Sequence, residues 1–184
     1  DMLARLLTQE TQFFRYRGLF SAFELNVLPD LQARGCWDKD HALRVWSAGC
    51  ASGEEPYSIA LSVCEVGSHT GLGANIIATD ISREALVRAD GAVYRKRSLE
   101  NVSLPHIAQY FTEHGDGYQV KPVLREMVTF APMNLAEPLY LGRFDCIFCM
   151  NVLIYFGAEL RSKLIQRFYE YLDPGGYLFL GHAE

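Results

Sequence analysis

Short apolar runs alternate with amphipathic stretches along most of the chain. Apolar runs of strand length lie at 43–48, 76–79, 127–130, 144–149 and 177–180. Stretches with apolar residues at helical spacing follow them at 56–66, 83–89 and 158–171. Strands that alternate with helices form a parallel sheet with helices on both faces. The pattern therefore predicts an α/β fold with a doubly wound sheet of five strands.

Two segments depart from this alternation. Residues 1–40 carry apolar residues at helical spacing and predict a helical N-terminal segment or linker, ahead of a main domain at 41–184. Between about 92 and 123, glycines and a proline interrupt the rhythm around a helix-like stretch at 105–111 and a hairpin around 118–124. We interpret this second segment as a small insertion outside the main sheet.

The composition narrows the class of protein. The 184 residues are 49% hydrophobic and 21% charged, as in ordinary globular domains, and suit one domain with a sizeable core. The net charge of -5 argues against general nucleic-acid binding, and no apolar run of about 18 residues predicts membrane insertion. Five cysteines without framework spacing, and no secretion signal, predict a reducing, cytoplasmic location.

Cys146 and Cys149 match the Cys-x-x-Cys spacing of metal and redox sites. They lie in an apolar run of strand length, where residues three apart point to opposite faces. We therefore expect them to pack in the core, and we predict no bound metal.

A glycine-containing loop follows the first predicted strand. Gly49 and Gly53 lie in it, and Glu54 and Glu55 open the next helix. A strand, a glycine loop and a helix start form the nucleotide-binding corner of a doubly wound fold. Two carboxylates there would repel a pyrophosphate, and the Gly-x-Gly-x-x-Gly order is absent. The loop thus favours a ligand with an adenosine and a cationic end, such as S-adenosylmethionine.

Helix capping alone is the alternative for this loop. Ser52 and Glu55 fit the capping-box spacing, and Pro56 suits an early helical position. Capping does not account for the glycines or for Asp80, at the tip of the second strand. A carboxylate at that place accepts the ribose hydroxyls of a nucleoside. Asp80 also suits the N-cap of the next helix, although Ser82 is equally suited to that role.

Five ordered motifs span nearly the whole chain. They read Thr-Gln-Phe-Phe-Arg at 11–15, Gly-Glu-Glu-Pro-Tyr-Ser-Ile-Ala at 53–60, Ala-Thr-Asp-Ile at 78–81, Ile-Phe-Cys-Met-Asn-Val-Leu-Ile-Tyr-Phe at 147–156 and Pro-Gly-Gly-Tyr-Leu-Phe-Leu-Gly-His at 174–182. Together they resemble the CheR family of bacterial chemoreceptor protein-glutamate O-methyltransferases. The resemblance implies that a methyl group passes from S-adenosylmethionine to glutamate carboxylates on chemoreceptor cytoplasmic helices, giving glutamyl methyl esters.

The resemblance also implies an architecture. The family has a Rossmann-like methyltransferase fold, a helical N-terminal domain and, at the place of the insertion, a β-subdomain used in receptor contact. Methyltransferases of this fold normally add a C-terminal hairpin of two strands, so we expect those C-terminal strands to be missing here. We also expect a monomer.

The resemblance implies catalytic roles for Arg15 and Tyr155, which lie near the reacting centre in the family's pattern. The resemblance also implies cofactor-binding roles for Thr11, Arg15, Glu55, Asp80, Asn134, Leu135, Asn151 and Val152. The glycine loop adds Gly49 as a further cofactor contact. Gln9 stands where the family usually has asparagine, and we retain it as a contact because it keeps the amide. The alternatives are a solvated arginine for Arg15, a core aromatic for Tyr155 and turn chemistry for the two asparagines.

Two further positions depart from the family's pattern, and one charged run has two interpretations. Met150 replaces the usual arginine before Asn151, and Ala183 replaces the serine after His182, for which we expect a structural role. The basic run at 95–97 is either a solvated face or a patch that steers a glutamate-rich receptor helix.

A glutamate nucleophile needs no general base, because its reference pKa of about 4.3 leaves it ionised at neutral pH. Catalysis then rests on alignment and on the exclusion of water. Two other functions stay open: a CheR-like signalling module that binds the cofactor without turnover, and a methyltransferase for small carboxylic acids. Arg15 and Tyr155 favour the enzyme over the module, and the insertion argues against a small acid.

Overall fold

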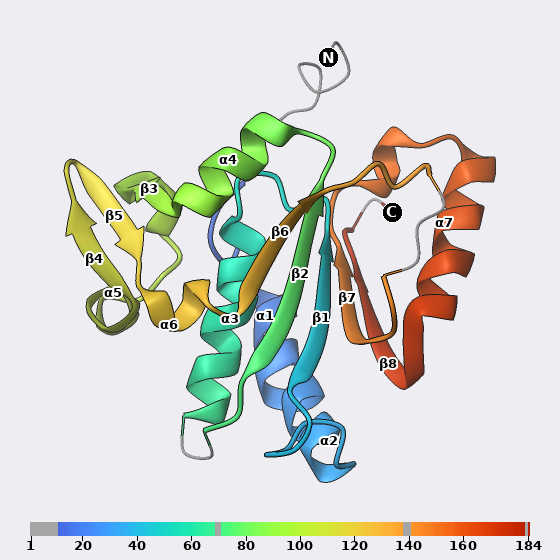
Figure 1. Cartoon of the computed structure of the whole chain (residues 1–184), viewed down its shortest axis with the longest axis horizontal. Helices are drawn as coiled ribbons and strands as arrows, with labels where there is room; N and C mark the ends of the chain where they lie inside the picture. Colours follow the sequence, from blue (N-terminus) through green and yellow to red (C-terminus); the bar gives the residue numbers. More distant parts are fainter. Residues whose placement is uncertain (1–10, 69–70, 138–140, 183) are drawn as a thin grey trace.

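A computed structural model describes residues 11–68, 71–137, 141–182 and 184 (Figure 1). Its main sheet has five strands in the order β6 (Val128–Pro132), β2 (Ala74–Asp80), β1 (Leu43–Ala48), β7 (Phe144–Cys149) and β8 (Leu172–Leu180). Every neighbouring pair is parallel. The predicted doubly wound sheet of five strands is therefore confirmed.

The strand order fixes where a ligand would bind. The chain moves outward from β1 to β2 and β6, then returns to the other side of β1 for β7 and β8. The loops that follow β1 and β7 thus diverge in opposite directions. In doubly wound sheets, this reversal opens a crevice at the carboxyl ends of the strands.

One face of the sheet is covered by the helices that precede β1 and by the helices that follow β1 and β2. They are α1 (Arg17–Ala22), η1 (Phe23–Val27), α2 (Leu28–Ala33), α3 (Glu54–Gly67) and α4 (Arg83–Gly91). Beneath them the ring of Phe148 stacks on Phe179, with centroids 4.2 Å apart, and meets Phe23 edge-on. This face holds the larger hydrophobic core.

The opposite face packs against α7 (Ala158–Tyr171). Trp46 and Ile147 are side by side in the β1–β7 register, and both belong to a core cluster with Leu164 and Phe168 of α7. Because side chains alternate along a strand, Val45 and Phe148 point into the first core instead. Helices thus lie on both faces of the sheet, as predicted.

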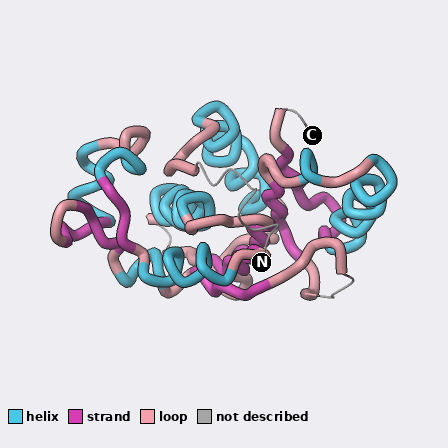
Figure 2. The backbone as a smooth tube through the Cα atoms, turned by 90° about the horizontal axis from the view of Figure 1, so that it is seen from above, coloured by secondary structure: helices cyan, strands magenta, loops and turns pink. Residues whose placement is uncertain are grey.

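The insertion is a small unit between α4 and β6. It contains β3 (Val93–Arg95), η2 (Lys96–Leu99), α5 (Leu104–Tyr110), β4 (Phe111–His114), β5 (Gly117–Val120) and α6 (Pro122–Arg125). Its strands form an antiparallel sheet in the order β3-β5-β4. Seen from above, this unit lies at one end of the molecule and α7 at the other (Figure 2).

The hairpin inside the insertion lies further upstream than predicted. Its strands are β4 and β5, and the turn between them contains Gly115 with a φ of +59°. Residues after Pro122 form a helical turn instead of a strand, because proline has no N–H to donate to a ladder and suits the first turn of a helix. The prediction of a hairpin around 118–124 was therefore wrong in position.

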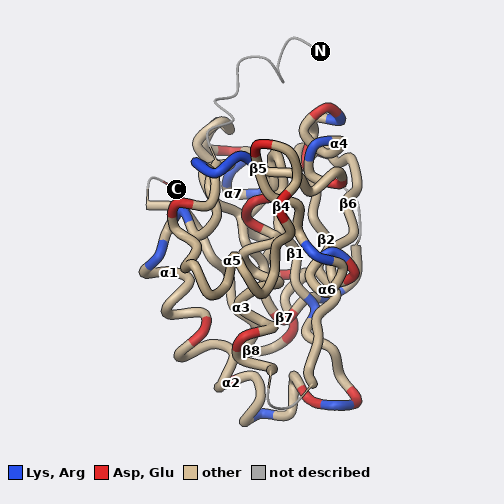
Figure 3. Tube along the Cα trace, turned by 90° about the vertical axis from the view of Figure 1, so that its left-hand side faces the viewer, with Lys and Arg blue, Asp and Glu red and all other residues tan. Residues whose placement is uncertain are grey.

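The described residues have two further general features, one of charge and one of helix length. Acidic and basic residues are spread over many elements of the trace (Figure 3). No helix within the described ranges is long and apolar enough to cross a membrane.

Candidate active site

The loop between β1 and α3 has a conformation that glycine makes possible. Gly49 and Gly53 have φ values of +87° and +92°, and Ala51 between them is also left-handed at +46°. A Cβ on Gly49 would lie 2.3 Å from a methyl carbon of Val152. The loop after β1 and the loop after β7 therefore approach closely only because Gly49 has no side chain.

The two carboxylates at the start of α3 do not form a capping box. The N-cap residue is Gly53, which makes no side-chain hydrogen bond, and the Ser52 hydroxyl donates to the Glu54 carboxylate at 2.7 Å. Glu55 accepts a hydrogen bond from the Ser47 hydroxyl at 2.7 Å. Capping alone is therefore the wrong explanation for these residues, and Glu55 is left to line a cavity.

Burial raises the pKa of Glu55 to about 7. Loss of solvent is the largest cause, and the nearby Glu184 carboxylate raises the pKa further, whereas Ser47 and Arg15 lower it. A cation placed beside a buried carboxyl group stabilises its ionised form. Glu55 is thus suited to an ammonium group.

Asp80 links the end of β2 to the glycine loop. One carboxylate oxygen accepts from the Ala51 N–H at 2.9 Å, and the other accepts from the Ser82 N–H at 2.8 Å. Ser82 is the N-cap of α4, and its hydroxyl accepts from the Ala85 N–H. The helix-cap role therefore belongs to Ser82, while Asp80 lines the cavity.

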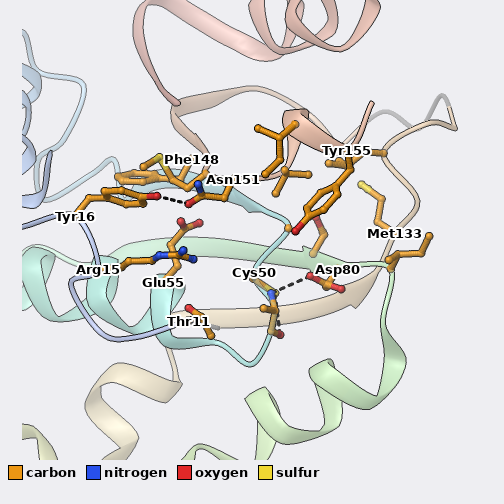
Figure 4. Close-up of a pocket in the computed structure, with 18 of the residues that line it drawn as sticks. Thr11, Arg15, Tyr16, Cys50, Glu55, Asp80, Met133, Phe148, Asn151 and Tyr155 are labelled. Carbon is orange, nitrogen blue, oxygen red and sulfur yellow. Dashed lines mark hydrogen bonds between the residues drawn. The ribbon is translucent and has the colours of Figure 1, made fainter. Parts of the chain in front are cut away.

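A cavity of about 560 Å³ lies at the carboxyl ends of the strands, where the strand order reverses (Figure 4). Its walls come from residues 11–20, 49–55, 79–81, 133–136 and 148–156. The structure places these sequence-predicted residues on those walls: Thr11, Arg15, Gly49, Glu55, Asp80, Asn134, Leu135, Asn151, Val152 and Tyr155. The predicted contact Gln9 lies outside the described residues.

Arg15 and Tyr155 reach this cavity from different elements. Arg15 precedes α1, and Tyr155 ends the 3-10 turn η3 (Leu153–Tyr155) after β7. In Figure 4, Arg15 lies beside Glu55, and Tyr155 lies above Cys50 and Asp80. Tyr155 is 46% exposed, so the alternative of a core aromatic is wrong for this residue.

The two asparagines have different local roles. The Asn134 side chain accepts from the Ala136 N–H and donates to Glu137, so turn chemistry does occupy it. The Asn151 side chain instead accepts from the Tyr16 hydroxyl at 2.6 Å, and its backbone is left-handed with a φ of +61°. Asn151 is thus fixed by the segment before α1.

Sequence reasoning missed two residues at this site. Tyr16 holds the Asn151 side chain, and its ring meets the His182 ring edge-on, which gives His182 the structural contact predicted for it. Glu184 accepts from the backbone N–H groups of Val152 and Leu153. The only signal for either was its place beside a motif, directly after Arg15 for Tyr16 and two residues after His182 for Glu184.

The cysteines make no disulfide. Cys146 belongs to the core under α3, and Cys149 belongs to the core under α7, so the Cys-x-x-Cys pair faces opposite sides of the sheet as predicted. Cys50 lines the cavity, and burial raises its pKa well above the ordinary value. Its thiol is therefore protonated at neutral pH. Among the described residues, no cluster of three His, Cys, Asp or Glu side chains suits a metal ion.

The family described as "CheR methyltransferase, SAM binding domain" matches residues 9–184. The chain belongs to this family. It is 39% identical to Chemotaxis protein methyltransferase 1 of Pseudomonas aeruginosa, over 97% of this chain and 67% of that protein. It is 35% identical to a chemotaxis protein methyltransferase of Borreliella burgdorferi, over 100% of this chain and 67% of that protein. This CheR domain thus spans about two thirds of the length of these curated relatives.

Among solved structures, the CheR domain is similar to the glycopeptide N-methyltransferase MtfA in complex with S-adenosyl-L-methionine. The TM-score is 0.49 and the identity 14%, over 95% of this chain and 58% of that chain.

As a CheR domain, the chain is an S-adenosylmethionine-dependent methyltransferase, and the cavity fits that cofactor. Its walls carry the two carboxylates of Glu55 and Asp80. Apolar side chains of Met133 and Leu135 line the same walls and offer surface for a flat ring.

Proposed function

We propose that this CheR domain transfers the methyl group of S-adenosylmethionine to glutamate side chains on the cytoplasmic helices of chemoreceptors, and that the products are glutamyl methyl esters. The observation that carries the proposal is the convergence of Arg15 and Tyr155 on the cavity that also holds Glu55 and Asp80. The names of the chemotaxis methyltransferases that it resembles support the same assignment.

Residues of the loops hold the cofactor in this proposal. The Glu55 carboxylate binds the ammonium group, and Asp80 accepts from the ribose hydroxyls with the lone pairs that its two backbone hydrogen bonds leave. Leu135 and Met133 pack against the adenine, and Asn151 borders the sulfur. When bound, the cofactor supplies an electrophilic methyl group on a sulfonium.

Arg15 and Tyr155 position the substrate. The incoming carboxylate is already ionised, so no residue has to remove a proton from it. The Arg15 guanidinium pairs with this carboxylate, and the Tyr155 hydroxyl donates a hydrogen bond to it. No described residue that lines the cavity is a histidine or a lysine, and Glu55, whose pKa is about 7, binds the cofactor in this proposal and removes no proton.

The rim of the cavity favours a protein substrate over a small acid. Ile81, Ile154 and Tyr155 are 36%, 40% and 46% exposed, and all three line the cavity. A protein partner would cover this exposed apolar rim and remove its side chains from water, whereas a small acid would leave the rim exposed. The exposed run Arg95, Lys96 and Arg97 in the insertion adds a positive charge that attracts a glutamate-rich helix.

We also propose that the domain acts as a monomer in the cytoplasm. Its five free cysteines suit a reducing compartment, and the proposed substrate helices lie there.

The experiment combines methyl labelling with single-site variants. The protein is incubated with labelled S-adenosylmethionine and receptor cytoplasmic fragments, and base-labile methyl esters on glutamate are measured. We expect esters with the wild type, slower single-turnover transfer but unchanged S-adenosylhomocysteine affinity with Tyr155→Phe, and losses of both with Arg15→Ala. Tyr169→Phe is the matched control, because Tyr169 is 74% exposed on α7 and distant from the cavity walls.

Two results would count against the proposal. A wild type that binds S-adenosylhomocysteine but forms no glutamyl ester would remove the substrate assignment. A Tyr155→Phe variant with the wild-type transfer rate would remove the role of that hydroxyl.

A further inference from the structure

The segment that carries Asn151 and Tyr155 has an unusual backbone. Asn151 is left-handed, at a φ of +61°, and the chain then enters the short 3-10 turn Leu153–Tyr155. The first N–H groups of such a turn have no partner within it, and the N-cap residue Val152 supplies no side-chain hydrogen bond. Something outside the segment has to satisfy these groups.

Glu184 satisfies them from beyond the end of β8. One carboxylate oxygen accepts from the Val152 N–H at 2.5 Å and from the Leu153 N–H at 2.7 Å. The other oxygen accepts from the Gly181 N–H at 2.5 Å. One carboxylate thus joins the loop after β7 to the end of β8 through three backbone donors, and hydrogen bonds to a charged acceptor are the stronger kind.

The fit around Glu184 is close. A Cβ on Gly181 would lie 2.8 Å from the Glu184 carboxylate and 3.2 Å from the Asn151 nitrogen. Gly181 therefore makes room for both the carboxylate and the loop. On the other side of the same loop, the Tyr16 hydroxyl holds the Asn151 side chain at 2.6 Å.

Glu184 also acts on the electrostatics of the cavity. Its charge raises the pKa of Glu55, which lies on the cavity wall, and it raises the pKa of Cys149 at the end of β7. The carboxylate therefore lies close enough to Glu55 to influence how that residue binds a cation.

We infer that Glu184 is a positioning residue, which fixes the loop 151–155 and through it the Asn151 amide and the Tyr155 hydroxyl. The part concerning Tyr155 rests on the proposed function. Glu184 touches neither substrate nor cofactor in this assignment; it acts through the backbone of Val152 and Leu153.

The test compares Glu184→Ala and Glu184→Gln in the full chain, with Glu170→Ala as a control on the exposed face of α7. With alanine, we expect the Val152 and Leu153 amides to lose hydrogen-exchange protection by about tenfold or more. Single-turnover transfer should fall by about 10-fold to 100-fold, since misplacing a reacting group has that effect, while the KM for the receptor fragment changes little. Glutamine keeps one acceptor oxygen, so it should restore much of the protection and of the rate.

A second measurement does not need turnover. The pH midpoint of S-adenosylhomocysteine binding should move to lower pH in Glu184→Gln, because the charge that raises the pKa of Glu55 is gone. Glu184→Ala with wild-type exchange at Val152 and Leu153 would overturn the inference. If Glu184→Ala alters hydrogen exchange at Val152 and Leu153 but the wild type forms no glutamyl esters, the result would instead count only against the proposed function.

Discussion

The hydroxyl of Tyr94 donates a hydrogen bond to the carbonyl oxygen of Ser52 over 2.7 Å. Tyr94 belongs to β3 of the insertion, and Ser52 belongs to the glycine loop that borders the cavity. The contact is close, because a Cβ on Gly53 would lie 2.8 Å from the Tyr94 hydroxyl. The ring of Tyr94 also meets Phe13 edge-on at 5.0 Å. The insertion therefore braces both the loop and the segment that carries Arg15.

Tyr94→Phe should weaken S-adenosylhomocysteine binding by about fivefold. The substitution keeps the ring but leaves the Ser52 carbonyl without its partner, which costs about 1 kcal/mol. Calorimetry measures the affinity. Tyr177→Phe is the matched control, because its hydroxyl also loses a hydrogen bond, to Asp30, far from the cavity walls. Equal losses in both variants would mean that the contact has no special effect on the loop.

Asp80→Ala should lower the affinity for S-adenosylhomocysteine by about 1–3 kcal/mol. It removes the proposed acceptor for the ribose and also frees the Ala51 and Ser82 N–H groups. Asp116→Ala, on the exposed turn of the insertion, is the control. Wild-type affinity for Asp80→Ala would contradict the ribose assignment, and competition by NAD would contradict the choice of cofactor.

The affinity for S-adenosylhomocysteine should depend on pH through Glu55. The pKa of Glu55 in the ligand-free protein is about 7, and an ammonium group binds its ionised form. Below pH 7 the carboxyl must first lose a proton, so the affinity should fall by about tenfold for each further pH unit. Calorimetry between pH 5 and 8 should show this fall, and Glu55→Gln should flatten it. A flat wild-type profile would contradict the assignment.

The same group affects the stability of the ligand-free protein in a defined direction. Its folded pKa is raised above its ordinary value of 4.5. Glu55 therefore stabilises the folded state fully below that value, and the contribution is lost as the pH rises through about 7.

Asp145→Ala should reduce the free energy of unfolding by about 2 kcal/mol. Asp145 is only 4% exposed at the start of β7, and it accepts from the Arg44 backbone at 2.8 Å and from its guanidinium at 3.2 Å. Glu159→Ala is the control, since it breaks an exposed pair with Lys163 and should change stability by less than about 0.5 kcal/mol. Urea unfolding distinguishes the two variants, and similar midpoints would show that the hydrogen bonds of Asp145 contribute little.

The sequence predicted strands and helices best where the apolar period was long and regular. The bounds predicted for β1, β7 and α7 match the structure. β8 begins at Leu172, earlier than predicted, because Pro174, Gly175 and Gly176 resemble a turn but continue the strand through an irregular register. In the insertion, short elements offered too few residues for a period, and glycine positions alone did not fix the turn.

The residues that line the cavity were predictable where a motif named them, and not where the partner is distant in sequence. The motifs placed Arg15, Asp80 and Tyr155, and each lines the cavity. Tyr16 was missed because its partner Asn151 is 135 positions away, and no local pattern encodes that contact. The capping-box alternative failed for a local reason, since the Ser52 hydroxyl turns to the neighbouring Glu54 carboxylate instead of a backbone N–H.

The walls of the cavity come from segments between residues 11 and 156, and the Tyr16–Asn151 hydrogen bond joins two of these segments across 135 positions. A partly folded chain with β1, β2 and β6 in place would therefore still have no binding site. Cofactor binding therefore requires these long-range contacts and stabilises only the folded domain, by about 2.7 kcal/mol at a hundred times the Kd. A supply of S-adenosylmethionine thus shifts the folding equilibrium towards the completely folded domain.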